Sequence, residues 1–170
     1  QMFQYALGRS ISIKRGIPFV LDISHFNNNK LRNYCLSFFN IIENIANQDQ
    51  IFKIKNNFYS DLRANLYSLS ILPYYKLSYV TENYEKYYTY DPNIFKVPKN
   101  AYLDGYWQSD KYFEEIQDII RAEFTLKVGL DSNLKKILET IQKTESVSLH
   151  IRRGDYVNNP IVKNVHGICS

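Results

Sequence analysis

Segments with the period of an amphipathic helix alternate along the chain with short apolar segments, and this alternation limits the fold more than any other feature. Residues 1–16 place Leu7 and Ile11 on one helical face, and Gly16 is suited to the left-handed residue that ends a helix. Residues 18–22 then have the character of a short buried strand that ends in a carboxylate. A helix followed by a strand is the second half of a βαβ unit, so the chain is predicted to be α/β with parallel sheets.

The alternation returns after residue 99. Residues 101–106 are predicted to form a strand and residues 112–124 a helix. A second helix is predicted to begin at Asp131 or Ser132, because either side chain suits an N-cap. Residues 147–151 are predicted to form a short strand. The apolar faces of the two helices are Phe113, Ile116, Ile120 and Phe124 in the first, and Leu134, Ile137, Leu138 and Ile141 in the second.

The middle of the chain carries weaker signals. Residues 27–29 are predicted to be a loop, residues 36–42 a strand, and residues 47–72 a mostly helical stretch that ends at Pro73. Most of the fifteen tyrosines lie between residues 59 and 112. They could form a platform for stacking sugars or bases, or they could pack in the interior, and we favour packing.

Composition excludes several classes of protein. The chain has 170 residues, 45% of them hydrophobic, which is enough for a sizeable core and too apolar for a disordered chain. Its net charge of +4 comes from scattered Lys and Arg, so no nucleic-acid partner is expected. No apolar run reaches about 18 residues, so no transmembrane segment is expected. Cys35 and Cys169 have no ligands at metal spacing around them, so no metal site is expected.

The strongest candidate site is the His-Ile-Arg-Arg-Gly-Asp-Tyr segment that begins at His150, at the end of a predicted strand. Ligands of open α/β sheets bind beyond such strand ends. The guanidinium groups of Arg152 and Arg153 match phosphate oxygens, and Gly154 lets the backbone turn sharply or approach a ligand closely. Asp155 could orient an arginine or accept a proton. The residues alone indicate a phosphate or nucleotide site, and the alternative is a surface turn whose charges pair with one another.

A second candidate site holds the single tryptophan. Tyr106 and Trp107 could stack on the apolar face of a sugar, while Gln108 and Ser109 could reach its hydroxyl groups. In the alternative, which the residues alone favour, Ser109 or Asp110 caps the following helix and the aromatic rings pack in the interior.

Three segments, in order along the chain, resemble the alpha-1,2-fucosyltransferases of glycosyltransferase family 11. The segment that begins at His150 is similar to the family's His-x-Arg-Arg-x-Asp signature. The first six residues, Gln-Met-Phe-Gln-Tyr-Ala, resemble the end of its N-terminal Gly-x-Gly-Asn-Gln-Met-Phe-Gln-Tyr-Ala segment. Residues 105–113 resemble a third family segment. The resemblance implies a truncated, bacterial-type member of the family. The sequence begins just after the position of the Gly-x-Gly-Asn loop and ends shortly after the signature.

The resemblance implies transfer of L-fucose from GDP-fucose to the 2-hydroxyl of a galactose residue, with inversion at the anomeric carbon and without a metal or other cofactor. It implies the GT-B arrangement of two Rossmann-like domains that face a cleft, incomplete at both ends in this chain. Residues 1–145 would form the acceptor-side domain without its first strand, and residues 146–170 the start of the GDP-fucose-binding domain. This chain alone would then bind GDP-fucose poorly.

The resemblance also implies roles for the signature residues. Arg152 would bind the β-phosphate of GDP, with Arg153 and Gly154 completing the donor-phosphate site, and would stabilise charge on the leaving diphosphate. Asp155 would orient an arginine or act as the general base, and His150 would line the catalytic site.

The acceptor rim of the cleft is expected at Gln1, Tyr106, Trp107, Gln108 and Ser109. The expected partners are GDP-fucose and a galactose-terminated glycan, in a cytoplasmic or inner-membrane-peripheral bacterial setting. Two alternatives stay open: a carbohydrate-binding or scaffold module without turnover, and a transferase that uses another nucleotide sugar.

Overall fold

The computed structural model describes residues 1–27, 32–60, 66, 68–69, 72–83, 89–149, 151 and 157, without the side chains of residues 57–60. The chain divides into two compact units, Gln1–Val128 and Gly129–Ser170. Both described strands belong to the first unit. The two domains predicted from the resemblance, residues 1–145 and 146–170, stay a prediction.

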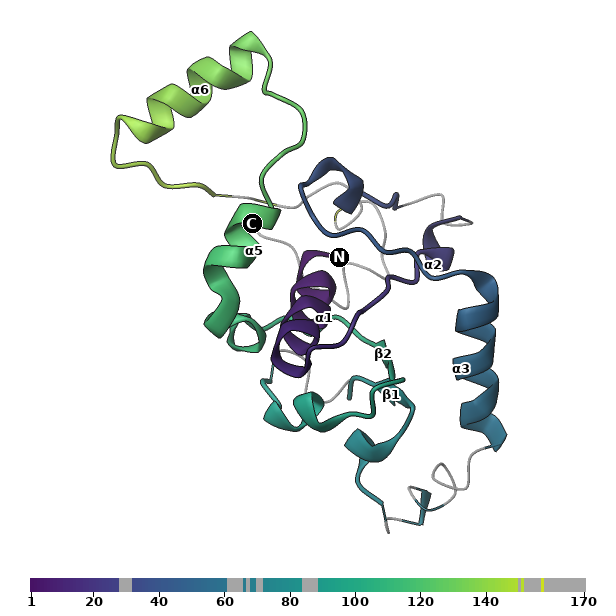
Figure 1. The fold of residues 1–170 in the computed structure, drawn as a ribbon. Helices are drawn as coiled ribbons and strands as arrows, with labels where there is room; N and C mark the ends of the chain where they lie inside the picture. The colour runs from purple at the N-terminus through teal and green to yellow at the C-terminus, as the bar shows by residue number, and fades with distance from the viewer. Residues whose placement is uncertain are drawn as a thin grey trace. The chain divides into compact units, whose positions relative to one another are not determined.

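Helix α1, Met2–Arg15, confirms the first predicted helix (Figure 1). Gly16 follows it with a φ of 60°, in the left-handed region that glycine adopts without strain. Lys14 and Arg15 lie in the last turn, where positive charge interacts favourably with the helix dipole. Arg15 also donates to the carbonyl oxygen of Val97, so the end of the helix is joined to a distant part of the same unit.

The strand predicted at residues 18–22 is wrong. Only Leu21 pairs, through a single parallel bridge to Ile45. Pro18 has no N–H to donate to a neighbouring strand, and the side chain of Val20 is 47% exposed rather than buried. The only strand-like pairing of the described segment is therefore at Leu21, directly before the carboxylate of Asp22.

Strands β1, Tyr79–Thr81, and β2, Tyr102–Asp104, pair in parallel, with Val80 opposite Leu103. Strand β2 confirms, in shorter form, the strand predicted at residues 101–106. Strand β1 is not predicted, because three residues are too few to show an alternating pattern. Parallel strands among helices are compatible with the α/β class, while the pair of Rossmann-like domains stays a prediction.

Helix α3, Gln48–Ser60, confirms the start of the helical stretch predicted at residues 47–72, most of whose remainder lies outside the described residues. Pro73, predicted to end that stretch, precedes a 3-10 turn. The loop predicted at residues 27–29 is described only at Asn27, which is the last residue of a short helix. The short helices of this part are α2 (Ser24–Asn27), η2 (Tyr74–Lys76) and η4 (Pro92–Lys96).

The strand predicted at residues 36–42 is also wrong. A 3-10 turn, η1 (Leu36–Phe38), takes its first residues, and Phe39 makes a single antiparallel bridge to Leu126. The side chain of Phe38 is 59% exposed. The apolar run that suggested a strand is therefore divided between a turn and a bridge.

The helix predicted at residues 112–124 is shorter than expected. Two 3-10 turns precede the α-helical part, because the backbone leaves the helical region at Phe113 and again at Ile116. Ile116 and Ile120 are buried as predicted. The elements are η5 (Asp110–Tyr112), η6 (Glu114–Ile116) and α5 (Gln117–Glu123).

Two apolar cores hold the first unit together. In the first, Leu7 of α1 and Val80 of β1 belong to one cluster, so the helix packs on the small sheet. Tyr74, Tyr75 and Tyr90 pack against this core, in agreement with the packing interpretation of the tyrosine-rich segment. The cores are Leu7, Ile11, Leu77, Val80, Ile94, Val97, Trp107 and Tyr112 in the first, and Tyr5, Ala6, Leu36, Ile41, Ile116 and Ile120 in the second.

A polar network crosses the second core. The buried Tyr5 hydroxyl donates to Glu123 Oε2 at 2.6 Å and accepts the backbone N–H of Ile42 at 3.0 Å. Arg9 Nε donates to the other oxygen of Glu123 at 2.8 Å. Burial, and then the hydrogen bond to Glu123, raise the pKa of Tyr5 well above its ordinary value, so the hydroxyl keeps its proton and joins α1 to α5.

The second unit contains helix α6, Ser132–Gln142, which confirms the second predicted helix. Asp131 is its N-cap and accepts the N–H groups of Asn133 and Leu134 at 2.8 and 2.9 Å. The apolar residues of the helix are 40–55% exposed. None of the described helices is long and apolar enough to cross a membrane.

The strand predicted at residues 147–151 is wrong over its described residues, 147–149 and 151, which belong to no strand. Val147 is 95% exposed and Leu149 81% exposed. A strand exists only by pairing, and no described residue of the second unit pairs with this segment.

Candidate functional site

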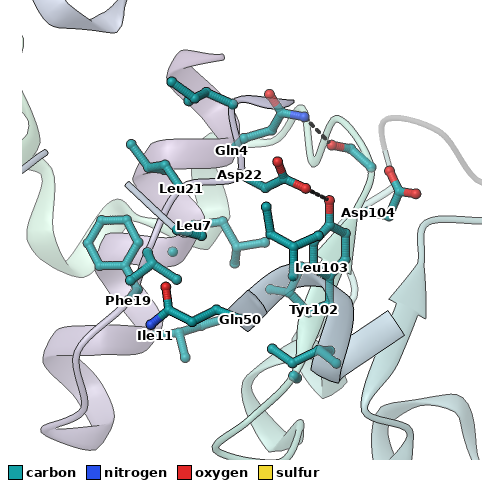
Figure 2. A pocket seen from close by; sticks show the side chains of 18 of the residues that line it. Gln4, Leu7, Ile11, Phe19, Leu21, Asp22, Gln50, Tyr102, Leu103 and Asp104 are labelled. Carbon is teal, nitrogen blue, oxygen red and sulfur yellow. Dashed lines mark hydrogen bonds between the residues drawn. The ribbon is translucent and has the colours of Figure 1, made fainter. Parts of the chain in front are cut away.

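The first unit holds a cavity of about 1300 Å³ between α1, the chain around Asp22, α3 and the segment that follows β2 (Figure 2). Leu7, Ile11 and Phe19 form an apolar part of its wall. The side chains of Gln4, Asp22 and Asp104 add hydrogen-bonding groups. The cavity therefore combines apolar and polar surface, as small-molecule sites do.

Asp22 is a hydrogen-bonded carboxylate of this wall. The Tyr102 hydroxyl donates to Asp22 Oδ2 at 2.6 Å, and the Ser24 N–H donates to Oδ1 at 2.8 Å. Lys55 Nζ lies 3.6 Å from Oδ2. Burial alone would raise the pKa of Asp22, but the hydrogen bonds from Ser24 and Tyr102 and the charge of Lys55 outweigh it and lower the pKa. Asp22 is therefore ionised at neutral pH.

Two stacked tyrosines support the carboxylates. The rings of Tyr79 and Tyr102 lie 5.0 Å apart and nearly parallel, at 6°. The Tyr79 hydroxyl donates to Asp104 Oδ2 at 2.7 Å, as Tyr102 does to Asp22. Burial, followed by the hydrogen bond to Asp22, raises the pKa of Tyr102 well above its ordinary value. Each carboxylate keeps further lone pairs for hydroxyl groups of a ligand.

A buried carboxylate holds the segment after β2. Glu82 follows β1, is 8% exposed, and accepts the N–H of Tyr106 at 2.7 Å and that of Trp107 at 3.2 Å. On the other side, Gln4 Nε2 donates to the carbonyl oxygen of Gly105 at 2.7 Å (Figure 2). The peptide group that joins Gly105 to Tyr106, here called the rim peptide, is therefore bound at both its carbonyl and its N–H.

Three of the five residues predicted for the acceptor rim line this cavity. Tyr106 is 51% exposed, whereas Trp107 is 5% exposed and belongs to the first core. Gln1 also lines the cavity, and its side chain bonds the backbone of residues 33 and 35. Gln108 and Ser109 do not line it. Ser109 occupies the N-cap position of η5 without a side-chain cap bond. The roles of these five residues stay a prediction.

The predicted donor-phosphate and catalytic residues lie outside the described residues. Their roles therefore stay predictions as well. Within the described part of the chain, no cluster of three or more His, Cys, Asp or Glu side chains could hold a metal ion. The five residues are His150, Arg152, Arg153, Gly154 and Asp155.

Four residues of the site are not among those that the sequence suggested: Gln4, Asp22, Glu82 and Asp104. Glu82 directly follows a strand too short to predict, so the rule that ligands gather at strand ends could not be applied to it. Gln4 is a polar residue among apolar neighbours in the first part of α1, and that contrast was the available signal.

Residues 62–170 match the sequence model described as glycosyl transferase family 11. The chain is 34% identical over 173 residues to an alpha-1,2-colitosyltransferase of Escherichia coli, an alignment that covers 100% of this chain and 56% of that protein. It is 30% identical over 186 residues to the O-antigen biosynthesis glycosyltransferase WbnK of Escherichia coli, covering 99% of this chain and 60% of that protein. The chain thus spans little more than half the length of either relative. No solved structure matches it.

Proposed function

The chain belongs to glycosyltransferase family 11, and from that premise we propose that the full-length protein transfers L-fucose from GDP-fucose to the 2-hydroxyl of a galactose residue, with inversion. The observation that carries the proposal is the family match over residues 62–170, which includes the Arg152–Arg153 pair. The name of the colitosyltransferase relative, which states an alpha-1,2 linkage, supports the linkage.

The donor part of the proposal assigns phosphate binding to Arg152, Arg153 and Gly154. A guanidinium at the β-phosphate stabilises the negative charge that develops on the leaving diphosphate, which a transferase without a metal must neutralise through its own side chains. His150 lines the catalytic site, and Asp155 orients an arginine or removes the proton of the acceptor hydroxyl.

The acceptor part of the proposal uses the cavity of the first unit. The ionised Asp22 and the phenol-bound Asp104 accept hydrogen bonds from sugar hydroxyls. Tyr106, half-exposed at the cavity, offers an aromatic face to the apolar side of a galactose ring. The volume suffices for more than one sugar unit, which suits a glycan rather than a free monosaccharide.

A nucleotide sugar other than GDP-fucose is the second candidate donor. It is favoured by the name of the relative at 34% identity, which is a colitosyltransferase. In this alternative the same phosphate site and the same acceptor cavity serve a different nucleotide sugar. Only the pocket around the sugar ring would then distinguish the two functions.

The test is a donor panel with the full-length protein and a β-galactoside acceptor. Transfer from GDP-fucose is expected, and it should persist in excess EDTA because no metal takes part. Preferential use of another nucleotide sugar would establish the second donor class. Galactoside binding without turnover on any donor would contradict both and would indicate a carbohydrate-binding module.

A further inference from the structure

The rim peptide lies between two side chains that come from distant parts of the first unit's sequence. Gln4 of α1 binds its carbonyl oxygen, and Glu82 binds its N–H at 2.7 Å. A peptide group bound in this way cannot rotate without breaking at least one of the two bonds. Because Glu82 also accepts the Trp107 N–H, both peptide groups that flank Tyr106 are held, and this restricts the direction of the Tyr106 Cα–Cβ bond relative to the cavity.

The backbone conformation of the next residue, Trp107, explains why this segment must be held in place. Trp107 has a φ of 53°, in the left-handed region that bulky residues rarely adopt. That conformation costs free energy and persists only where surrounding contacts impose it. Glu82 supplies such a contact by accepting the Trp107 N–H at 3.2 Å, while Tyr112 packs edge-on against the indole.

The close approach of Glu82 to the backbone is built into the sequence. A Cβ added to Gly105 would lie 2.4 Å from Glu82 Cβ and 2.9 Å from Glu82 Oε2. Residue 105 must therefore be glycine for the carboxylate to reach the two N–H groups. Glu82 N also donates to the Asp104 carbonyl oxygen at 2.8 Å, so its own backbone is held against the same segment.

From these contacts we infer that Glu82 is a positioning residue for the acceptor sugar. It fixes the rim peptide, together with Gln4, and so presents the half-exposed Tyr106 at the cavity in one orientation. Glu82 lines the cavity too, but both of its oxygens accept backbone N–H groups, so in this inference it acts through Tyr106. The inference rests on the proposed function, because it names the part of that site which sets acceptor affinity.

The kinetic test compares Glu82→Gln, Tyr106→Ala and the double variant in the full-length enzyme. Glu82→Gln keeps the size of the side chain but turns an amide NH2 toward a backbone N–H. We expect it to raise the acceptor KM about tenfold, with donor KM and kcat little changed. Glu114→Gln, which removes the same charge from an exposed carboxylate, is the matched control and should leave all three constants unchanged.

The double variant decides whether Glu82 acts through Tyr106. If it does, Glu82→Gln adds nothing to the acceptor KM once Tyr106 is alanine. An equal, independent rise in the Tyr106→Ala background would overturn the inference, as would a loss confined to kcat. Should Glu82→Gln fail to fold, Gln4→Met removes the bond on the other side of the rim peptide and is expected to raise the acceptor KM in the same way.

A second readout does not depend on turnover. The full-length protein is labelled with 5-fluorotryptophan, and the Trp107 signal is assigned by its absence in Trp107→Phe. Glu82→Gln should shift or broaden that signal, and Glu114→Gln should not; an unchanged signal overturns the inference. If the wild-type protein transfers no sugar, the proposed function fails, while this signal still decides whether Glu82 holds the segment.

Discussion

Gln4 Nε2 lies 2.7 Å from the carbonyl oxygen of Gly105 and donates a hydrogen bond to it across 101 residues of chain. The two residues belong to the two described segments whose sequences resemble the family, the start of α1 and the loop after β2. The two segments that resemble the family are therefore in contact with each other at one cavity. This contact gives a structural role to the polar residue at position 4, whose neighbours in the first part of α1 are apolar.

Gly105→Ala should destabilise the first unit. Its new Cβ would lie 2.4 Å from Glu82 Cβ, a distance that real Cβ atoms do not show, so the two segments must move apart. Overpacking of this kind costs about 1–3 kcal/mol, and the loss of the Glu82 bonds adds to it. Urea unfolding measures the change. Gly129→Ala is the control, because nothing lies within 4 Å of the added Cβ there; a similar loss in both variants would contradict the explanation.

Some of this arrangement follows from sequence and some does not. Helix α1 and helix α6 are predictable because their signals are local: the apolar period, Gly16 after the first, and Asp131 before the second. The strand predicted at residues 18–22 failed because strand formation needs a neighbour. Only Leu21 finds one, at Ile45, a residue that no local pattern identifies.

The site shows the same limit. Tyr106 and Trp107 are adjacent aromatic residues, and both are predicted from the sequence to stack on a sugar at the acceptor rim. The structure separates them, because the left-handed φ of Trp107 turns its ring into the first core while Tyr106 stays half-exposed. Glu82 accepts the Trp107 N–H and lies 25 residues before it in the sequence. No sequence pattern at that separation could have predicted this hydrogen bond.

Asp22→Asn should change how the free energy of unfolding depends on pH in the acidic range. The pKa of Asp22 is lowered in the folded protein, so its contribution is present above its ordinary value of 3.8 and is lost as the pH falls through the lower, folded value. The variant should be less stable than wild type at pH 7, by about 1 kcal/mol for weakened hydrogen bonds. It should also lose less stability between pH 5 and pH 2.

Thermal unfolding at a series of pH values checks this. Asp118→Asn is the control, since the Asp118 side chain is 93% exposed and the change there should leave the acid profile as in wild type. Parallel acid profiles for wild type and Asp22→Asn would contradict the role assigned to the Tyr102 and Ser24 hydrogen bonds.

Tyr5→Phe should change how the stability of the protein depends on alkaline pH. The pKa of Tyr5 is raised, mainly by burial, so its contribution is complete below the ordinary value of 10.0 and is lost as the pH rises above it. Removing the hydroxyl leaves the Ile42 N–H and one Glu123 oxygen without this partner, at a cost of about 1–3 kcal/mol at pH 7. The variant should then lose less further stability above pH 10. Chemical unfolding at pH 7 and pH 10.5 measures both effects, and an unchanged midpoint at pH 7 would contradict them.

We propose that this chain belongs to an enzyme that joins fucose to the 2-hydroxyl of galactose through a phosphate site at Arg152. The most direct measurement is nuclear magnetic resonance of the product formed by the full-length protein from GDP-fucose and a β-galactoside, for wild type and Arg152→Ala. An α-1,2-linked fucoside is expected from the wild type. Arg152→Ala should lose most turnover while its unfolding temperature stays unchanged. A different linkage, no product, or undiminished turnover in Arg152→Ala would contradict it.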